Sequence, residues 1–205
     1  MTEQSWPPRS LEPTDHFIDE KQPDWHLNAC VGRQLPNERG GLYYSDGFRS
    51  AARRLVEDLI ERPDIDLPVD TAVYPIVFLY RHNLELLLKF LIVRGRWLIS
   101  ESGDQPRGHR LDKLWMTARP IVERCFDEAD WSQNDIVTSL MSELSGLDPN
   151  GEAARYMESN KGMKHFAELA LLNIRHFADI AERLSEYLST VLGTIEMMDS
   201  QRCEC

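Results

Sequence analysis

The sequence lacks the short motifs that mark the common nucleotide and metal sites. It has no glycine-rich phosphate loop and no H-E-x-x-H pair of histidines. Its four cysteines are scattered, without the C-x-x-C spacing of a zinc or redox site: Cys30, Cys125, Cys203 and Cys205. We therefore expect no metal and no cofactor. The scattered cysteines and an N-terminus without an apolar run predict a cytoplasmic protein with reduced thiols.

Positive charge is scarce too. The 23 Lys and Arg against 34 Asp and Glu give a net charge of −11, which argues against indiscriminate binding to nucleic acid. Between Arg81 and Arg124 the balance reverses, with nine basic against five acidic residues, so the composition allows one local anion-binding face. No apolar run reaches the roughly 20 residues that a membrane-spanning helix needs, and we expect no membrane contact.

The sequence does show helical periodicity. Apolar residues recur at spacings of three and four, without strand-like alternation. With 42% hydrophobic and 28% charged residues, this pattern predicts a single all-α bundle of about five main helices. We expect an irregular proline-rich arm over 1–42 that packs on the domain or on a partner, the bundle over 43–198, and a frayed tail over 199–205. The main helices are expected over about 46–62 and 71–100, from 109, from 132, and over about 163–198.

The helix over about 71–100 is expected to be the central one. It is apolar on nearly every side, which is typical of a helix in a core, and Pro75 is expected in its first turn. One narrow ionic stripe covers roughly a quarter turn at about 100° per residue, and it holds Arg81, His82, Glu85, Lys89 and Arg96. The stripe has two explanations: an internal Arg–Glu–Lys ladder at i, i+4 spacing, or a cleft that holds an anion.

The other helices carry smaller predictions. Ser132-x-x-Asp135 resembles a capping pattern, and Pro120 is expected to kink or restart its helix. The buried face of the helix from residue 132 is predicted to consist of Ile136, Leu140, Met141 and Leu144. The last helix, about 54 Å long at about 1.5 Å per residue, exceeds what a compact domain needs. We therefore expect its C-terminal half to pair with a second subunit in a homodimer.

Residues near the helix ends extend the ionic stripe into a predicted network. Asp148 is expected to cap the turn in which it sits, and Arg155 to reach back to a carboxylate such as Glu85. His109 is expected to act as a cap or a hinge hydrogen bond at the start of its helix. On this interpretation one polar network fixes the bundle, and its members are Arg81, Glu85, Lys89, Asp148, Arg155 and Tyr156.

Three motifs in this chain resemble bacterial HEPN-like (higher eukaryote and prokaryote nucleotide-binding) proteins. They are Tyr80-Arg81-His82-Asn83-Leu84-Glu85-Leu86-Leu87-Leu88-Lys89, then Gly108-His109-Arg110-Leu111-Asp112-Lys113-Leu114-Trp115, then Asp148-Pro149 followed by Arg155-Tyr156. The resemblance spans roughly residues 44–192. It implies a compact bundle of four or five helices that is commonly dimeric. The superfamily includes metal-independent RNA-cleaving toxins and antiviral effectors, and also members without catalysis that bind nucleotides or partner proteins.

One departure from that family concerns catalysis. Catalytic members carry an arginine, four to six residues, and then a histidine, late in the domain. Here nine residues separate Arg155 from His165, whereas Arg175 and His176 are adjacent. The one formal match, Arg9 to His16, lies in the proline-rich arm. The standard ribonuclease signature is therefore missing.

Arg81 and His82 are the candidate substitutes for that signature. In metal-free RNA cleavage a histidine moves a proton and an arginine neutralises the charge of the phosphorane. The alternative is that His82 packs between helices and Glu85 neutralises Arg81. Two hypotheses for the whole chain follow. One is an RNA- or nucleotide-associated module in a bacterial defence or toxin system, and the other is a non-catalytic dimerisation or protein-interaction domain whose charged stripe is structural.

Overall fold

The structure, a computed structural model, describes residues 40–61, 69–126, 131–156 and 171–202. Within these ranges the chain forms helices and no strand, which confirms the predicted all-α bundle. The helices are α1 (Gly40–Glu61), α2 (Val69–Leu98), α3 (Leu111–Cys125), α4 (Ser132–Leu147) and α5 (Ile174–Arg202). None of them has an apolar stretch long enough to cross a membrane. The expected arm falls outside the described residues up to position 39.

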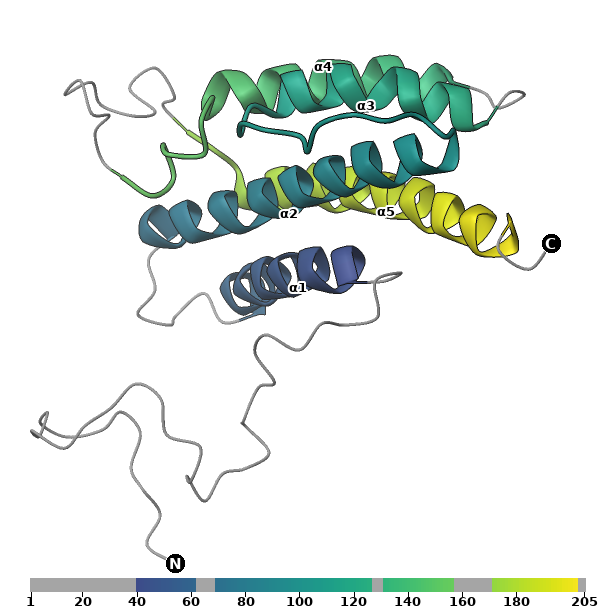
Figure 1. The fold of residues 1–205 in the computed structure, drawn as a ribbon. Helices are drawn as coiled ribbons and strands as arrows, with labels where there is room; N and C mark the ends of the chain where they lie inside the picture. The colour runs from purple at the N-terminus through teal and green to yellow at the C-terminus, as the bar shows by residue number, and fades with distance from the viewer. Residues whose placement is uncertain (1–39, 62–68, 127–130, 157–170, 203–205) are drawn as a thin grey trace, which may run out of the picture. The chain divides into compact units, whose positions relative to one another are not determined.

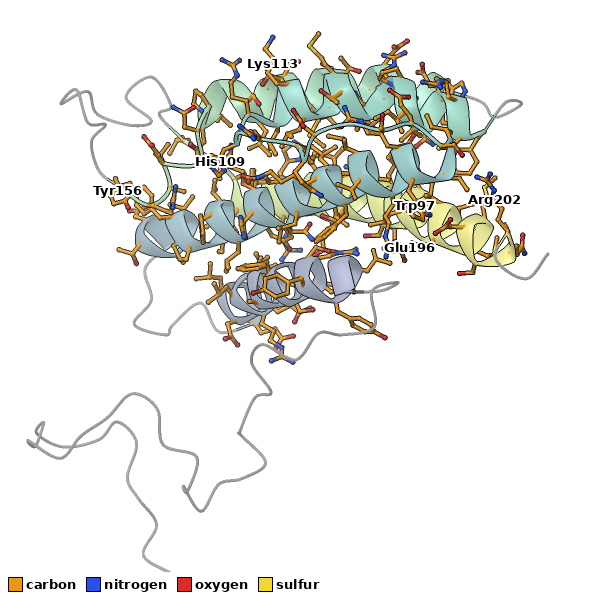
Figure 2. All side chains as sticks on the ribbon, in the orientation of Figure 1. Trp97, His109, Lys113, Tyr156, Glu196 and Arg202 are labelled. Atoms are coloured by element: carbon orange, nitrogen blue, oxygen red, sulfur yellow. The ribbon has the colours of Figure 1, made fainter. Side chains whose placement is uncertain are left out.

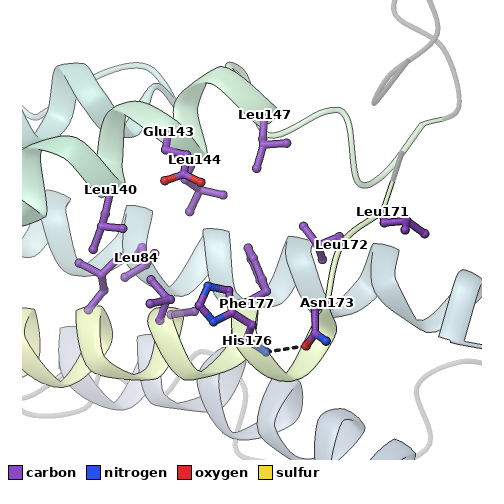
Figure 3. Close-up of a pocket in the computed structure, with 13 residues that line it drawn as sticks. Leu84, Leu140, Glu143, Leu144, Leu147, Leu171, Leu172, Asn173, His176 and Phe177 are labelled. Atoms are coloured by element: carbon purple, nitrogen blue, oxygen red, sulfur yellow. Dashed lines mark hydrogen bonds between the residues drawn. The ribbon is translucent and has the colours of Figure 1, made fainter. Parts of the chain in front are cut away.

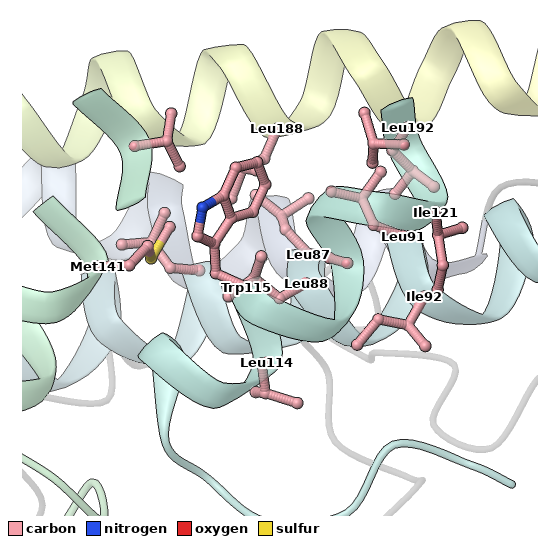
Figure 4. Packing of buried hydrophobic residues seen from close by; sticks show 14 of the residues in the cluster. Leu87, Leu88, Leu91, Ile92, Leu114, Trp115, Ile121, Met141, Leu188 and Leu192 are labelled. Atoms are coloured by element: carbon pink, nitrogen blue, oxygen red, sulfur yellow. The ribbon is translucent and has the colours of Figure 1, made fainter. Parts of the chain in front are cut away.

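Helix α2 is the centre of the bundle, as its apolar circumference predicts. It contacts α1, α3 and α5, with α1 on one side of the α2–α5 pair and α3 with α4 on the other (Figure 1). The main core surrounds Trp115 of α3, which is 1% exposed. Leu87 and Leu91 of α2, and Leu188 and Leu192 of α5, belong to the same core (Figure 4). A helix that is apolar all round thus finds a neighbour on each side.

Helices α2 and α5 run parallel and in register. Three hydrogen-bonded pairs along their length have nearly constant separations of 102, 102 and 104 positions: Tyr80–Glu182, Asn83–Ser185 and Leu98–Arg202. A parallel pair cannot be joined by a tight turn. The stretch over 99–173, which includes α3 and α4, connects the two helices.

Two of the predicted helix starts need correction. Helix α1 already begins at Gly40, about six residues before its predicted start near residue 46. Helix α2 begins at Val69, which places Pro75 in the second turn instead of the first. A proline there removes one backbone donor, and the packing of α2 on three neighbours outweighs that local cost.

Helix α5 differs at both ends from its predicted range. Residues 171–173 are not helical, and α5 begins at Ile174. The Asn173 side-chain oxygen accepts a hydrogen bond from the His176 amide at 2.9 Å, which caps the helix start. At the other end the helix continues to Arg202, so residues 199–202 are helical and not a frayed tail. Residues 163–170 lie outside the described part of the chain.

Helices α3 and α4 also refine the predictions. Helix α3 passes through Pro120 without a restart and begins at Leu111, two residues after His109. At the start of α4 the cap position is Trp131, which makes no side-chain cap, and Ser132 is the first helical residue, one position after it. Ile136 was predicted to be buried but is 60% exposed, and Val137 is buried at 4%. The predicted Met141 and Leu144 are buried, at 0% and 7%, so the buried face of α4 agrees with the prediction except at Ile136 and at the half-buried Leu140.

Candidate functional site

Arg81 is the hub of the predicted ionic stripe. It lies on α2 with only 2% of its surface exposed. Its Nη1 donates to Glu85 Oε2 at 3.2 Å, its Nε to the Asp148 carbonyl at 3.1 Å, and its Nη2 to the His109 carbonyl at 2.5 Å. The guanidinium fork thus ties the turn after α4 and the segment just before α3 to the central helix.

Glu85 is the anion of this cluster. It is 3% exposed, and its Oε1 accepts hydrogen bonds from Lys89 Nζ at 2.8 Å and from His109 Nδ1 at 2.9 Å. An ionised carboxylate only accepts, so His109 must carry its proton on Nδ1 in this contact. Burial by itself would raise the pKa of Glu85, but the bonds from Lys89 and His109 outweigh it and hold the pKa below its ordinary value. The predicted ladder along α2 is confirmed.

Asp148 fixes the turn after α4, as predicted. It is 1% exposed, and its Oδ1 accepts the amides of Glu152 at 2.8 Å and Ala153 at 3.1 Å. Its Oδ2 lies 3.6 Å from Arg81 Nε. Gly151 sits in the same turn at φ 75°, and a Cβ there would lie 2.7 Å from Arg81 Nη1. The turn therefore passes directly over the guanidinium, which requires glycine. We call Arg81, Glu85, Lys89, His109 and Asp148 the Arg81 cluster.

Two predicted members of the network have other contacts. Arg155 donates to the Gly151 carbonyl at 2.6 Å and does not take Glu85 as the predicted partner. Its guanidinium carbon lies 5.5 Å from the centre of the Phe78 ring and 5.6 Å from that of Tyr156. Tyr156 is 60% exposed. Both side chains therefore lie on the surface above the Arg81 cluster.

His82 belongs to this surface layer as well. Its ring meets Phe48 of α1 edge-on with centroids 4.4 Å apart, and it stacks on Phe78 at 5.7 Å. Burial lowers the pKa of His82, with a smaller opposing effect from the Glu85 charge. A ring held between two phenyl rings matches the helix-packing alternative. Arg81, the other candidate catalytic residue, donates its hydrogen bonds into the buried cluster and not toward this layer.

These contacts join into one continuous row of planar side chains across α1, α2 and the turn after α4. We call it the stacking row, and its members in order are Tyr44, Phe48, His82, Phe78, Arg155 and Tyr156. The Tyr44 and Phe48 rings, which start the row, lie 6.3 Å apart. Both ends are open, because Tyr44 is 66% and Tyr156 60% exposed. Figure 2 shows His109 and Tyr156 near the first half of α2, whereas Trp97 and Arg202 lie at its far end.

A second ionic cluster was missed by the sequence analysis. Glu182 of α5 accepts hydrogen bonds from Arg49 at 2.8 Å, from Arg53 at 2.6 Å and from the Tyr80 hydroxyl at 2.9 Å. We call these four residues the Glu182 cluster. The arginine pair is spaced i, i+4, as are Glu182 and Glu186. Both i, i+4 pairs are visible in the sequence, but 129 to 137 positions separate the arginines from their glutamate partners, so the sequence does not show that they pair.

The predicted basic excess between Arg81 and Arg124 is reduced by ion pairing. Several of its members face acids: Arg110 with Asp112, Arg119 with Glu123 and Asp135, Arg124 with Glu101, and Arg94 with Glu196. Asp112 shows the effect, since the hydrogen bond from Arg110 lowers its pKa to about 2. The basic stretch is thus not one open cationic face.

Within the described ranges, no group of three or more His, Cys, Asp or Glu could hold a metal ion. Comparison with known proteins found no matching family model, no matching curated protein and no matching solved structure.

Proposed function

We propose that the chain is a module that binds single-stranded RNA or a nucleotide by stacking, without the Arg–His ribonuclease chemistry of catalytic HEPN-like proteins. The observation that supports this proposal is the stacking row. It presents Arg155 between two aromatic rings and leaves a tyrosine open at either end. Unpaired bases stack on aromatic rings and on guanidinium planes, and the arginine also attracts phosphate.

The Arg81 cluster has a supporting part in this proposal. It pins the turn that carries Arg155 onto α2, so the exposed cation is held in a fixed place by buried groups. Each of the three guanidinium nitrogens of Arg81 already donates a hydrogen bond, and the residue is 2% exposed, which argues against contact with a substrate. The net charge of −11 limits binding to this local surface and makes it sensitive to salt. A cytoplasmic location and a place in a bacterial defence or toxin system belong to the same proposal, the latter through the family resemblance.

Fluorescence anisotropy with a labelled single-stranded RNA oligonucleotide tests the proposal, with a nucleoside monophosphate as competitor. Arg155→Ala and Tyr156→Ala should each weaken binding about 5- to 100-fold, because a stacked base contributes roughly 1–3 kcal/mol. Arg175→Ala removes the same charge from an exposed site on α5, and Trp97→Ala removes an aromatic ring that is 68% exposed at the far end of α2. Both controls should bind like the native chain.

The thermal unfolding midpoint of all four variants should stay within about 2 °C of the native value, because the residues lie on the surface. If Arg175→Ala weakened RNA binding as much as Arg155→Ala, the attraction would depend on charge alone. This result would contradict a stacking site. Cleavage of the RNA that depends on Arg81 and His82 would contradict the non-catalytic part of the proposal.

The second candidate function is a protein-interaction domain that forms a homodimer through the end of α5. Three large apolar side chains are exposed there: Tyr43 at 57%, Trp97 at 68% and Met197 at 56%. Cavities of about 540 and 470 Å³ lie on either side of the last turns of α5. One side of this part of α5 already packs in the core of its own chain, because Leu192 and Ile195 are fully buried. A molar mass of two chains in light scattering, reduced to one by Met197→Asp, would support this candidate.

A further inference from the structure

Helices α4 and α5 are joined at one end and separated at the other. The Tyr187 hydroxyl donates to Asn134 Oδ1 at 2.6 Å, which holds the middle of α5 against the start of α4. Toward Leu147 and Leu172 the two helices leave a groove of about 310 Å³ (Figure 3). Its floor is Leu84 of α2, which is fully buried. We call this feature the α4–α5 groove.

Both walls of the groove carry apolar side chains at helical repeats. On α5 the wall residues are Phe177, Ile180 and Leu184, spaced i, i+3 and i+7. On α4 the wall residues Leu140 and Leu147 continue a stripe that starts at Ile136, and the three fall within an arc of about 40° at about 100° per residue. Such a stripe is expected to be covered in a bundle, yet Ile136 is 60% exposed.

We infer that the α4–α5 groove binds an amphipathic helix of a partner protein, with a basic residue placed opposite Glu143. Two parallel apolar stripes form a slot for a third helix, whose anchors at i, i+3 and i+7 would enter the groove. The α4 stripe over 136–147 is about 17 Å long, which corresponds to about three helical turns.

The polar residues that line the groove are Glu143, Asn173 and His176, and Glu143 is the carboxylate among them. Glu143 is an exposed carboxylate of the α4 wall, and the whole chain has a net charge of −11. A helix with lysine or arginine beside its apolar stripe is therefore favoured over an acidic one. Asn173 indicates less about the partner, because its side-chain oxygen already accepts a hydrogen bond from the His176 amide.

A second copy of this chain fits the groove less well. A two-fold dimer brings the same patch of both subunits together, and two concave grooves do not fill one another. The groove lies between α4 and α5, whereas the stacking row lies on α1, on α2 and in the turn after α4, and no residue belongs to both. The two proposals can therefore fail independently.

The test uses the full chain and a synthetic fluorescent helix of about 15 residues, with leucine at i, i+3, i+4 and i+7 and lysine elsewhere. Two further peptides serve as references, one with the leucines moved off this pattern and one with glutamate in place of lysine. We expect micromolar binding of the first peptide alone. Leu140→Asp should weaken it at least about tenfold, because an apolar anchor then meets a charge.

Met116→Asp is the matched control, since it adds the same charge at a methionine of α3 that is 62% exposed. It should leave affinity within about twofold, as expected for a site outside the interface. Ile136→Asp changes an exposed stripe residue and should weaken binding even if Leu140→Asp disturbs folding. Glu143→Lys should shift the preference toward the glutamate peptide.

The inference is overturned by equal binding of the patterned and rearranged peptides, by equal effects of Leu140→Asp and Met116→Asp, or by a dimer of the free chain that Leu140→Asp dissociates.

Discussion

The Arg81 cluster and the Glu182 cluster are both centred on an ion that bridges helices or turns, but they differ in how much water reaches them. Arg81, Glu85 and Asp148 have side chains exposed by only 3%, 4% and 1%. In the other cluster Glu182 is 23% and Arg53 48% exposed. One is a cation enclosed by acceptors, and the other is an anion on which two arginines converge from the surface.

The comparison shows that burial, more than the number of ion pairs, decides what each cluster contributes. When a buried ion loses its partner, its charge is left without water or counter-charge, and the fold loses several kcal/mol. A half-exposed arginine that loses its carboxylate turns to solvent at little cost. We therefore expect the Arg81 cluster to hold the bundle together and the Glu182 cluster to adjust the packing of α1 on α5.

The largest expected effect is that of Arg81→Ala. It leaves Asp148 buried without its cation, leaves Glu85 with Lys89 alone as ion-pair partner on α2, and frees the two turns, so the free energy of unfolding should fall by about 3–5 kcal/mol. Urea unfolding followed by circular dichroism measures this loss. Arg81→Lys keeps the charge but loses the three-way fork, so its free energy of unfolding should lie between that of the native chain and that of Arg81→Ala. A loss below about 1 kcal/mol would remove the distinction between the clusters.

The next effect is that of Gly151→Ala, which should destabilise the chain by about 1–3 kcal/mol. The new Cβ would sit 2.7 Å from Arg81 Nη1 at a φ of 75°, so both the turn and the guanidinium would have to shift. Gly146→Ala is the control, because a Cβ there meets nothing within 4 Å inside α4. It should stabilise by about 0.5–1 kcal/mol. Thermal unfolding of both variants measures this difference. Equal shifts of the unfolding midpoint would contradict the close approach of Gly151 to Arg81.

The two clusters should also respond differently to pH. The pKa of Glu85 and that of Glu182 both lie below the ordinary value of 4.5, so each contributes stability above that pH and loses it as pH falls through its lowered pKa. Only the Glu182 cluster contains a tyrosine. Burial, together with the hydrogen bond to Glu182, raises the pKa of Tyr80, so its contribution is present below the ordinary value of 10 and declines as pH rises above it.

Urea unfolding between pH 3 and 11 separates these contributions. Glu85→Gln should flatten the acid side of the stability curve, and Tyr80→Phe should flatten the alkaline side. An alkaline decline that persists unchanged in Tyr80→Phe would contradict the assignment to this hydroxyl. Both variants should retain a helical spectrum at pH 7.

The smallest effect is expected for Arg53→Ala, which removes the half-exposed arginine of an ion pair with Glu182. The loss should stay below about 1 kcal/mol and shrink further in high salt. Chemical denaturation in low and high salt measures it. A loss as large as that of Arg81→Ala would show that exposure does not separate the two clusters.

The parts of the structure that the sequence predicts are those governed by local rules. Helical periodicity indicated α2 as the core helix, and the i, i+4 spacing of Arg81, Glu85 and Lys89 indicated their ladder. The contact of Asp148 with the amides that follow it is turn chemistry. What failed depends on neighbours distant in sequence. Arg155 stacks on Phe78 instead of pairing with Glu85, because the turn it belongs to is positioned by tertiary contacts.

The Glu182 cluster and the exposure of Ile136 could not be predicted for the same reason. Arg49 and Glu182 are 133 positions apart, and no periodic pattern gives their register. Ile136 fits an apolar face of α4 as well as Val137 does, and only the tertiary packing of α4 decides between them. The pairing of the C-terminal half of α5 with a second subunit stays a prediction.

The parallel register of α2 and α5 has a consequence for how the chain is made. During synthesis α2 emerges about a hundred residues before the helix that covers its leucines, at roughly 5–20 residues per second. For several seconds that surface must be shielded by nascent α1 and α3 or by a chaperone. A ribosome stalled before Ile174 should therefore display a protease-sensitive, aggregation-prone intermediate, and release of the last 30 or so residues should complete folding.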